Sequence, residues 1–151
     1  MNEKAICWRF HGYATKAEGR IVQEWFDGLS EDERDEALDT IGYLQHLRID
    51  QWKYPQFEHL GNGLSEIRFK VASLNLTVRI YGMFWPVGER FSYTFLYGGN
   101  KKLKNDKRGK KEAYRRKTFL ENGESTTHEF KFSNEPDSAT AKGKAKAVPI
   151  R

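Results

Sequence analysis

A change of hydrophobic period divides this chain into a helical first part and a strand-rich second part. Over residues 65–71, Ser, Ile, Phe and Val alternate with Glu, Arg and Lys. Residues 74–81 repeat this alternation, and residues 91–97 are aromatic at every second position. A period of two is typical of strands that have one buried face and one polar face. Short turns join the three segments, so we expect an antiparallel meander.

The residues before these strands have the period of a helix. Apolar residues recur on one helical face over residues 17–28, and Gly28 ends this helix. Ser30 and Glu33 have the spacing of a capping box, which begins a second helix that reaches about residue 48. A tight Gly-Leu-Ser link between the two helices predicts an antiparallel helical hairpin. An apolar, aromatic segment at residues 5–10 predicts a first strand.

The last third of the chain is more polar. Residues 106–121 predict a helix with few apolar residues, and residues 128–132 alternate like an edge strand. Residues 133–151 are rich in Ser, Ala, Lys, Gly and Pro, which predicts a disordered basic tail. The fold class expected is therefore α+β: an N-terminal helical hairpin packed on a small antiparallel sheet, with a basic C-terminal helix. Residues 1–121 form the expected domain, and residues 122–151 form an extension.

Composition limits the class of protein. The 151 residues are 38% hydrophobic and 14% aromatic, enough for one compact domain with an extension. No run approaches the roughly 18 apolar residues of a membrane-spanning helix, and the N-terminus lacks the pattern of a signal peptide. The single cysteine, Cys7, cannot form an internal disulfide. We therefore expect a cytoplasmic protein with no membrane partner.

Positive charge is concentrated after the sheet. Residues 1–60 have a net charge of −5, whereas residues 101–117 have a net charge of +8. Such a basic block favours a polyanion, and nucleic acid is the leading candidate partner. A solvated basic helix with no partner is the alternative. The polar residues of this region that we expect to contact RNA or its phosphates are Asn100, Lys101, Lys102, Lys104, Lys107, Arg108 and Arg115.

The polar face of the two long strands is the candidate site. If residues 65–71 and 74–81 pair, one face collects Glu66, Arg68, Lys70, Arg79 and Tyr81. A sheet face lined with Arg and Lys is suited to holding phosphate oxygens. The alternative is a polar face that is simply hydrated.

The residue types favour phosphodiester chemistry without a metal or cofactor. The four histidines are scattered, and Glu66 is the only acid expected on the polar face, so a two-metal site is not expected. RNA carries its own nucleophile, the 2′-hydroxyl. A protein can cleave RNA by orienting the strand, neutralising charge on phosphorus and moving protons. Aromatic side chains that could stack on single-stranded RNA are Tyr81, Tyr97 and Tyr114.

Four segments, residues 52–69, 78–80, 96–102 and 113–116, resemble the RelE/ParE toxin superfamily. The nearest branch is that of the HigB-like, phage-derived proteins. Its members have a "P…LG.GL.E.RF" stretch before a strand Arg, and an "LHG..KK" stretch before a basic helix. The chain has Pro-Gln-Phe-Glu-His-Leu-Gly-Asn-Gly-Leu-Ser-Glu-Ile-Arg-Phe beginning at Pro55, and Leu-Tyr-Gly-Gly-Asn-Lys-Lys beginning at Leu96. The resemblance covers residues 5–121 in the order of elements.

The resemblance implies the RelE-like fold and a toxin that cleaves mRNA, often on the ribosome, together with a cognate antitoxin. It places Arg68, Lys70 and Arg79 at the family's phosphate-binding positions. Lys101 and Lys102 fall near the family's basic residue that follows the last strand. The candidate catalytic residues are therefore Glu66, Arg68, Lys70, Arg79, Tyr97, Lys101 and Lys102. Three further positions complete the comparison: Tyr97 replaces a His, Tyr114 corresponds to a tyrosine of the C-terminal helix, and Glu66 replaces a Lys used as base.

Three functions remain open from the sequence. The first is a metal-independent RNA endonuclease, with Glu66 or another side chain as base. The second is a gyrase-directed toxin of the ParE type, which shares the fold and lacks the RNase residues. The third is a phage module that binds RNA or protein without catalysis, because a fold does not determine a function. The cluster of Arg68, Arg79 and Lys101 favours the first, whereas Glu66 and the missing His favour the third.

Overall fold

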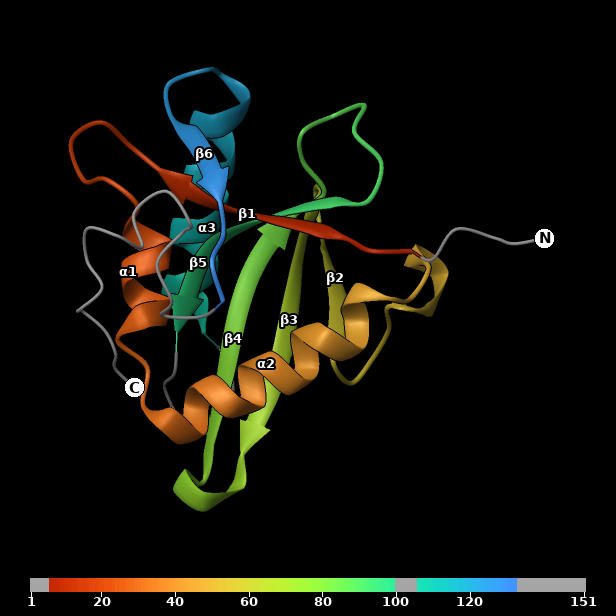
Figure 1. The fold of residues 1–151 in the computed structure, drawn as a ribbon. Coiled ribbons are helices and arrows are strands. Elements are labelled where there is room, and N and C mark those ends of the chain that lie inside the picture. Colours follow the sequence, from red (N-terminus) through yellow and green to blue (C-terminus); the bar gives the residue numbers. More distant parts are fainter. Residues whose placement is uncertain (1–5, 100–105, 133–151) are drawn as a thin grey trace, which may run out of the picture.

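The computed structural model describes residues 6–99 and 106–132, which form an α+β fold around one mixed sheet (Figure 1). The sheet has six strands in the order β2-β3-β4-β5-β1-β6. The strands are β1 (Arg9–Ala14), β2 (Phe57–Gly61), β3 (Leu64–Val71), β4 (Leu76–Met83), β5 (Ser92–Gly99) and β6 (Thr126–Glu129). The α-helices are α1 (Ile21–Asp27), α2 (Glu31–Gln45) and α3 (Lys107–Glu121), and two short 3₁₀ turns are η1 (Ile49–Gln51) and η2 (Ala72–Leu74).

The sheet is mostly antiparallel, but the expectation of a purely antiparallel sheet is wrong. Strand β1 lies between β5 and β6, and it runs parallel to β5 and antiparallel to β6. It also begins at Arg9, later than the strand expected at residues 5–10. A parallel pair needs a long crossover connection, which the helices and the meander supply between β1 and β5.

Two edge regions also differ from the expected boundaries. Residues 50–63, interpreted from sequence as a loop, contain the strand β2, which pairs with β3. At the opposite edge, β6 spans 126–129 rather than 128–132. The residues that follow β6 still contribute to the fold, because Phe130 is buried and packs against Phe26 and Phe95. The tail expected at residues 133–151 lies outside the described residues.

The capping box predicted for the second helix is confirmed. Ser30 Oγ accepts a hydrogen bond from the Glu33 amide at 3.2 Å, and Glu33 Oε1 accepts one from the Ser30 amide at 2.8 Å. These bonds satisfy amide groups that the first turn of a helix cannot pair internally. The first turn is also acidic, as the helix dipole favours. Helix α2 therefore begins where its sequence predicts.

The helical hairpin predicted for α1 and α2 is not formed in the way expected. Figure 1 shows the two axes diverging from their link instead of running side by side. Helix α1 packs on β1 and β5, whereas α2 packs on β3. The seven residues of α1 make only about two turns, which offer too little surface to pair along α2. Each helix instead buries its own apolar side on the sheet.

An aromatic core lies between the sheet and these two helices. Trp52 is central to it, with ring centroids at 4.7 Å from Trp8, 5.3 Å from Phe57 and 5.5 Å from Tyr93. Its indole N–H donates to the Leu44 carbonyl of α2 at 2.9 Å, so the buried polar atom is satisfied. This cluster holds α2 over the apolar face of β3 and β4, and leaves their polar face on the other side.

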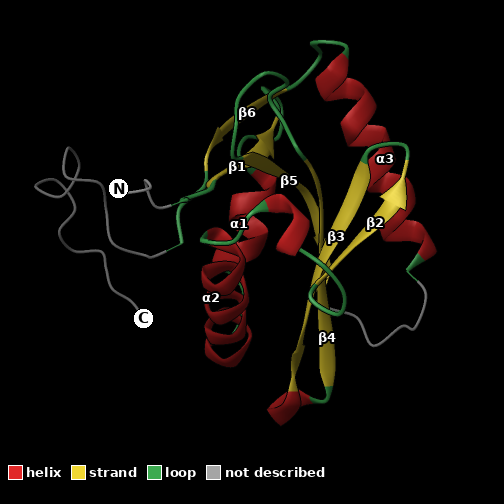
Figure 2. Ribbon diagram, turned by 90° about the vertical axis from the view of Figure 1, so that its right-hand side faces the viewer, coloured by secondary structure: helices red, strands yellow, loops and turns green. Residues whose placement is uncertain are grey.

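Helix α3 lies on the other face of the sheet (Figure 2) and contacts β5, β4 and β3. Its buried arginine, Arg116, does much of the anchoring. Arg116 donates to the Leu96 carbonyl at 2.9 Å and to Glu112 at 2.8 Å, and its guanidinium stands over the rings of Tyr13 and Tyr97. Within the described segments, no helix combines the length and the apolar character needed to cross a membrane.

Candidate functional site

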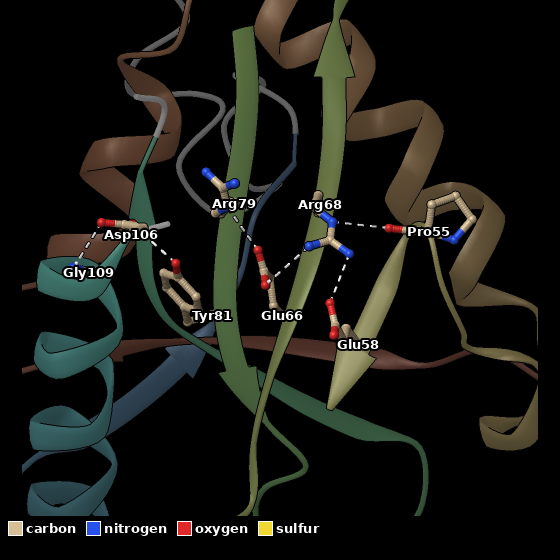
Figure 3. Close-up of polar contacts among 8 residues, drawn as sticks. All are labelled: Pro55, Glu58, Glu66, Arg68, Arg79, Tyr81, Asp106 and Gly109. Atoms are coloured by element: carbon tan, nitrogen blue, oxygen red, sulfur yellow. Dashed lines mark hydrogen bonds and ion pairs between the residues drawn. The ribbon is translucent and has the colours of Figure 1, made fainter. Parts of the chain in front are cut away.

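The register of β3 and β4 brings four of the predicted residues together. Glu66 lies opposite Tyr81, and Arg68 lies opposite Arg79, so all four point to the face that α3 partly covers. Figure 3 shows the Glu66 carboxylate between the guanidinium groups of Arg68 and Arg79. Lys70 is on the same side of β3 and is exposed. These residues therefore lie on one face, as predicted, but α3 covers part of that face, and Glu66 and Tyr81 are buried.

Glu66 is the centre of the cluster, and it is buried. Only 5% of the residue is exposed. Its Oε2 lies 3.1 Å from Arg79 Nε, and its Oε1 lies 3.6 Å from Arg68 Nη1. Oε2 has this ion-pair partner but accepts no hydrogen bond of good geometry among the described residues. Ion pairs with the two arginines thus position the carboxylate, and its Oε2 can still accept a proton.

Burial raises the pKa of Glu66 above its ordinary value. The positive charges of Arg68 and Arg79 oppose this rise, and so does Lys110 of α3. A carboxyl group whose pKa is moved toward neutrality is better suited to take up and release a proton at physiological pH. The site therefore combines a carboxyl group of raised pKa with neighbouring positive charges.

Arg68 is shared between two glutamates. Its Nη2 lies 3.0 Å from Glu58 of β2, and its Nε donates to the Pro55 carbonyl at 3.3 Å (Figure 3). Its side chain is 22% exposed, whereas that of Arg79 is 12% exposed. A ligand that approaches from solvent meets Arg68 more readily than Arg79.

Tyr81 connects the sheet to the beginning of α3. Its hydroxyl donates to Asp106 Oδ2 at 3.1 Å, while Asp106 Oδ1 accepts from the Gly109 amide at 3.0 Å (Figure 3). Burial and Asp106 raise the pKa of Tyr81, so the phenol stays protonated. A Cβ at Gly109 would collide with the Asp106 carboxylate. The hydrogen bonds that link Tyr81, Asp106 and Gly109 therefore position the beginning of α3 beside Glu66.

The expectation that Tyr81 stacks on RNA is wrong, because only 1% of this residue is exposed. Tyr97 is half-buried and lies against Tyr81 and beneath Arg116, so it supports α3. The hydroxyl of Tyr114 donates to the Gly61 carbonyl at 2.9 Å, which ties α3 to the turn between β2 and β3. These three tyrosines organise the helix and the sheet, and no contact places Tyr97 or Tyr114 at Glu66.

The other predicted RNA-binding residues lie on the exposed side of α3 or outside the described residues. Lys107 and Arg108 are exposed in its first turn, and Arg115 is exposed and paired with Glu112 at 2.8 Å. Asn100, Lys101, Lys102 and Lys104 lie outside the described residues.

Sequence reasoning missed Glu58, Lys110 and Asp106. Glu58 was not predicted to lie at the site because its strand, β2, was interpreted as a loop. Lys110 lies one turn before the buried Ala113, a helical spacing that could have placed it on the sheet-facing side. Asp106 precedes the helix at an N-cap position, where an aspartate is favoured.

The cluster can bind an anion and exchange a proton. Two guanidinium groups and an ammonium group can contact phosphate oxygens, and Glu66 can act as base. Among residues 6–99 and 106–132, no group of three or more His, Cys, Asp or Glu is arranged to hold a metal ion. Comparisons of the chain with protein-family models, with curated proteins and with solved structures gave no match.

Proposed function

We propose that this protein is an RNA endonuclease that cleaves single-stranded RNA through attack of the 2′-hydroxyl, without using a metal ion. The observation that carries the proposal is the buried Glu66 carboxylate between Arg68 and Arg79. A carboxylate with a raised pKa beside two guanidinium groups has the parts that this reaction needs.

In the proposed reaction, Glu66 takes the proton of the 2′-hydroxyl, and the resulting oxygen forms a bond to the adjacent phosphorus. The bond from phosphorus to the 5′-oxygen breaks, and that oxygen takes a proton, for which Lys110 is the candidate donor. The products are a 2′,3′-cyclic phosphate and a 5′-hydroxyl. Arg68 and Arg79 neutralise the charge that grows on the phosphate oxygens, and they act most strongly in a site that excludes water.

The biological setting that we propose is a toxin of a toxin–antitoxin pair that acts on mRNA, with the ribosome as a platform. The support for this setting is the resemblance of residues 52–116 to RelE/ParE toxins of the HigB-like branch, together with the net charge of +8 over residues 101–117. A ribosome presents a dense array of phosphates, to which such a basic segment is attracted at low and moderate salt.

A second candidate is a module that binds RNA or protein without catalysis. The observation that favours it is the near balance of charge within the cluster. Arg68 is paired with Glu58 and Glu66, and Arg79 is paired with Glu66. Such pairing reduces the positive charge that a phosphate would meet, so a purely structural role of these ion pairs predicts weak RNA binding and no cleavage.

The two candidates are separated by an Arg79→Gln variant and a matched control, Arg90→Gln, in the exposed loop before β5. Both variants lose one positive charge, but only Arg79 contacts Glu66. We expect the wild type and Arg90→Gln to cleave mRNA with ribosomes present, and Arg79→Gln to be slower by about 10²–10³. Intact mRNA with the wild type, or equal cleavage by Arg79→Gln, would favour the binding module.

A further inference from the structure

Tyr54 is an exposed aromatic residue at the border of the candidate site. Among the described Phe, Trp and Tyr residues, only Tyr43, at 56%, and Tyr54, at 71%, are exposed. Tyr43 is on α2, away from the polar face of the sheet. Tyr54 precedes β2, and its exposed ring retains apolar surface that folding has not buried.

Tyr54 is directly linked to the cluster through Arg68. The Arg68 guanidinium carbon lies 5.1 Å from the centroid of the Tyr54 ring, within the range of a cation–π contact. The same guanidinium is an ion-pair partner of Glu66 and donates to the carbonyl of Pro55, the residue after Tyr54 (Figure 3). The cation therefore stands between the aromatic ring and the buried carboxylate.

We propose that Tyr54 is the stacking platform for a nucleobase of single-stranded RNA, next to the phosphate that Arg68 holds. This inference rests on the proposed function and adds a substrate-positioning residue to it. The guanidinium lies over one face of the ring, and the large exposed fraction leaves surface for a base. Aromatic stacking beside a basic site is the usual way in which proteins hold unpaired bases.

The platform determines the class of substrate rather than its sequence. Every base has a π face, so stacking tolerates any base but requires one that is not paired in a duplex. Tyr54 should therefore favour single strands over duplexes and should place the scissile phosphate by holding the adjacent nucleoside. Its loss should weaken binding of the strand without altering the Glu66 cluster, because Glu58 and Pro55 also hold Arg68.

The test measures, by anisotropy, binding of a short fluorescein-labelled single-stranded RNA whose 2′-hydroxyls carry methyl groups, so that the protein cannot cleave it. The proteins are the wild type, Tyr54→Ala, Tyr54→Trp and the control Tyr43→Ala. We expect Tyr54→Ala to weaken binding about tenfold, within the range known for loss of one base–aromatic stack. Tyr54→Trp should bind at least as tightly as the wild type, and Tyr43→Ala should be unchanged. Circular dichroism checks that each variant is folded.

Tyr54→Ala could also weaken binding by moving Arg68, which contacts the Tyr54 ring. A second probe distinguishes this effect from the loss of base stacking. It is the same ribose–phosphate strand with its bases removed. The wild type should bind this abasic strand more weakly than the normal strand, and Tyr54→Ala should then cause no further loss. An equal loss on both strands, or no loss on either, would overturn the stacking role while leaving the proposed function intact. A wild type that binds neither strand would overturn the proposed function itself, and the stacking role with it.

Discussion

Replacing Glu66 by glutamine separates the two roles that we propose for this residue. The substitution keeps the shape of the side chain and removes its negative charge and its ability to accept a proton. The carboxylate lies 3.1 Å from Arg79 Nε and 3.6 Å from Arg68 Nη1, so it partly neutralises the groups that we expect to hold phosphate. Glu66→Gln should therefore bind RNA more tightly and cleave it more slowly.

The size of the binding effect follows from the geometry. A phosphate held by both guanidinium groups would be roughly 7 Å from the Glu66 carboxylate, where two unit charges repel by about 2 kcal/mol at an effective dielectric constant of about 20. Salt at about 0.1 M screens part of this repulsion. We expect Glu66→Gln to bind single-stranded RNA about tenfold more tightly near neutral pH. Loss of the base should slow cleavage by about 10²–10⁴.

The assay measures binding by anisotropy on a 2′-O-methylated RNA, which cannot be cleaved, and measures cleavage of the normal labelled RNA by the same preparations. Asp39→Asn, an exposed position on α2, removes the same charge from the other side of the sheet and serves as the control. The control should bind and cleave like the wild type. Unchanged or weaker binding by Glu66→Gln would refute the electrostatic argument, and cleavage at the wild-type rate would refute the role of Glu66 as base.

Further predictions concern stability. Gly109→Ala should lower the free energy of unfolding by about 1 kcal/mol, because the new Cβ would collide with Asp106, which caps α3. Gly42→Ala should raise the free energy of unfolding by up to about 1 kcal/mol, because Gly42 has open space around it. Denaturant titration measures both effects. Arg116→Met should cost about 2 kcal/mol in the same titration, because Arg116 donates to a buried carbonyl of β5 and to an acid of α3. Because the pKa of Glu66 is raised in the folded protein, its contribution to the free energy of unfolding is complete below its unfolded pKa and is lost as pH rises through the folded pKa. Glu66→Gln should remove this pH dependence of the free energy of unfolding. The same pH dependence in both proteins would contradict the argument from burial.

The sequence predicts the polar face of the site because its register is determined locally. The period of two assigns Arg68 and Arg79 to one face, and the short connection at residues 72–75 leaves little freedom in how β3 and β4 pair. The start of α2 is equally local, since Ser30 and Glu33 cap it across three residues. In both places, the information lies within a few residues of the structure that it specifies.

Long-range packing accounts for what the sequence did not predict. The parallel pairing of β1 with β5 joins segments about eighty residues apart, and no nearby turn specifies it. Strand β2 is a short edge strand with few buried side chains, so its pattern resembles that of a loop. The burial of Glu66 and Tyr81 depends on α3, which is anchored through a polar residue, Arg116, and therefore lacks a clear apolar stripe.

In the proposed reaction, RNA supplies the nucleophile, and the Glu66 cluster supplies the proton transfer and the positive charge. The most direct measurement uses two labelled RNAs that differ only by a 2′-deoxy sugar on the 5′ side of the cleaved bond, incubated with the protein and with ribosomes. We expect the normal RNA to yield a 2′,3′-cyclic phosphate and a 5′-hydroxyl, and the deoxy RNA to stay intact at this bond. Cleavage of the deoxy RNA at the same rate, or products with a 5′-phosphate, would contradict the proposed reaction.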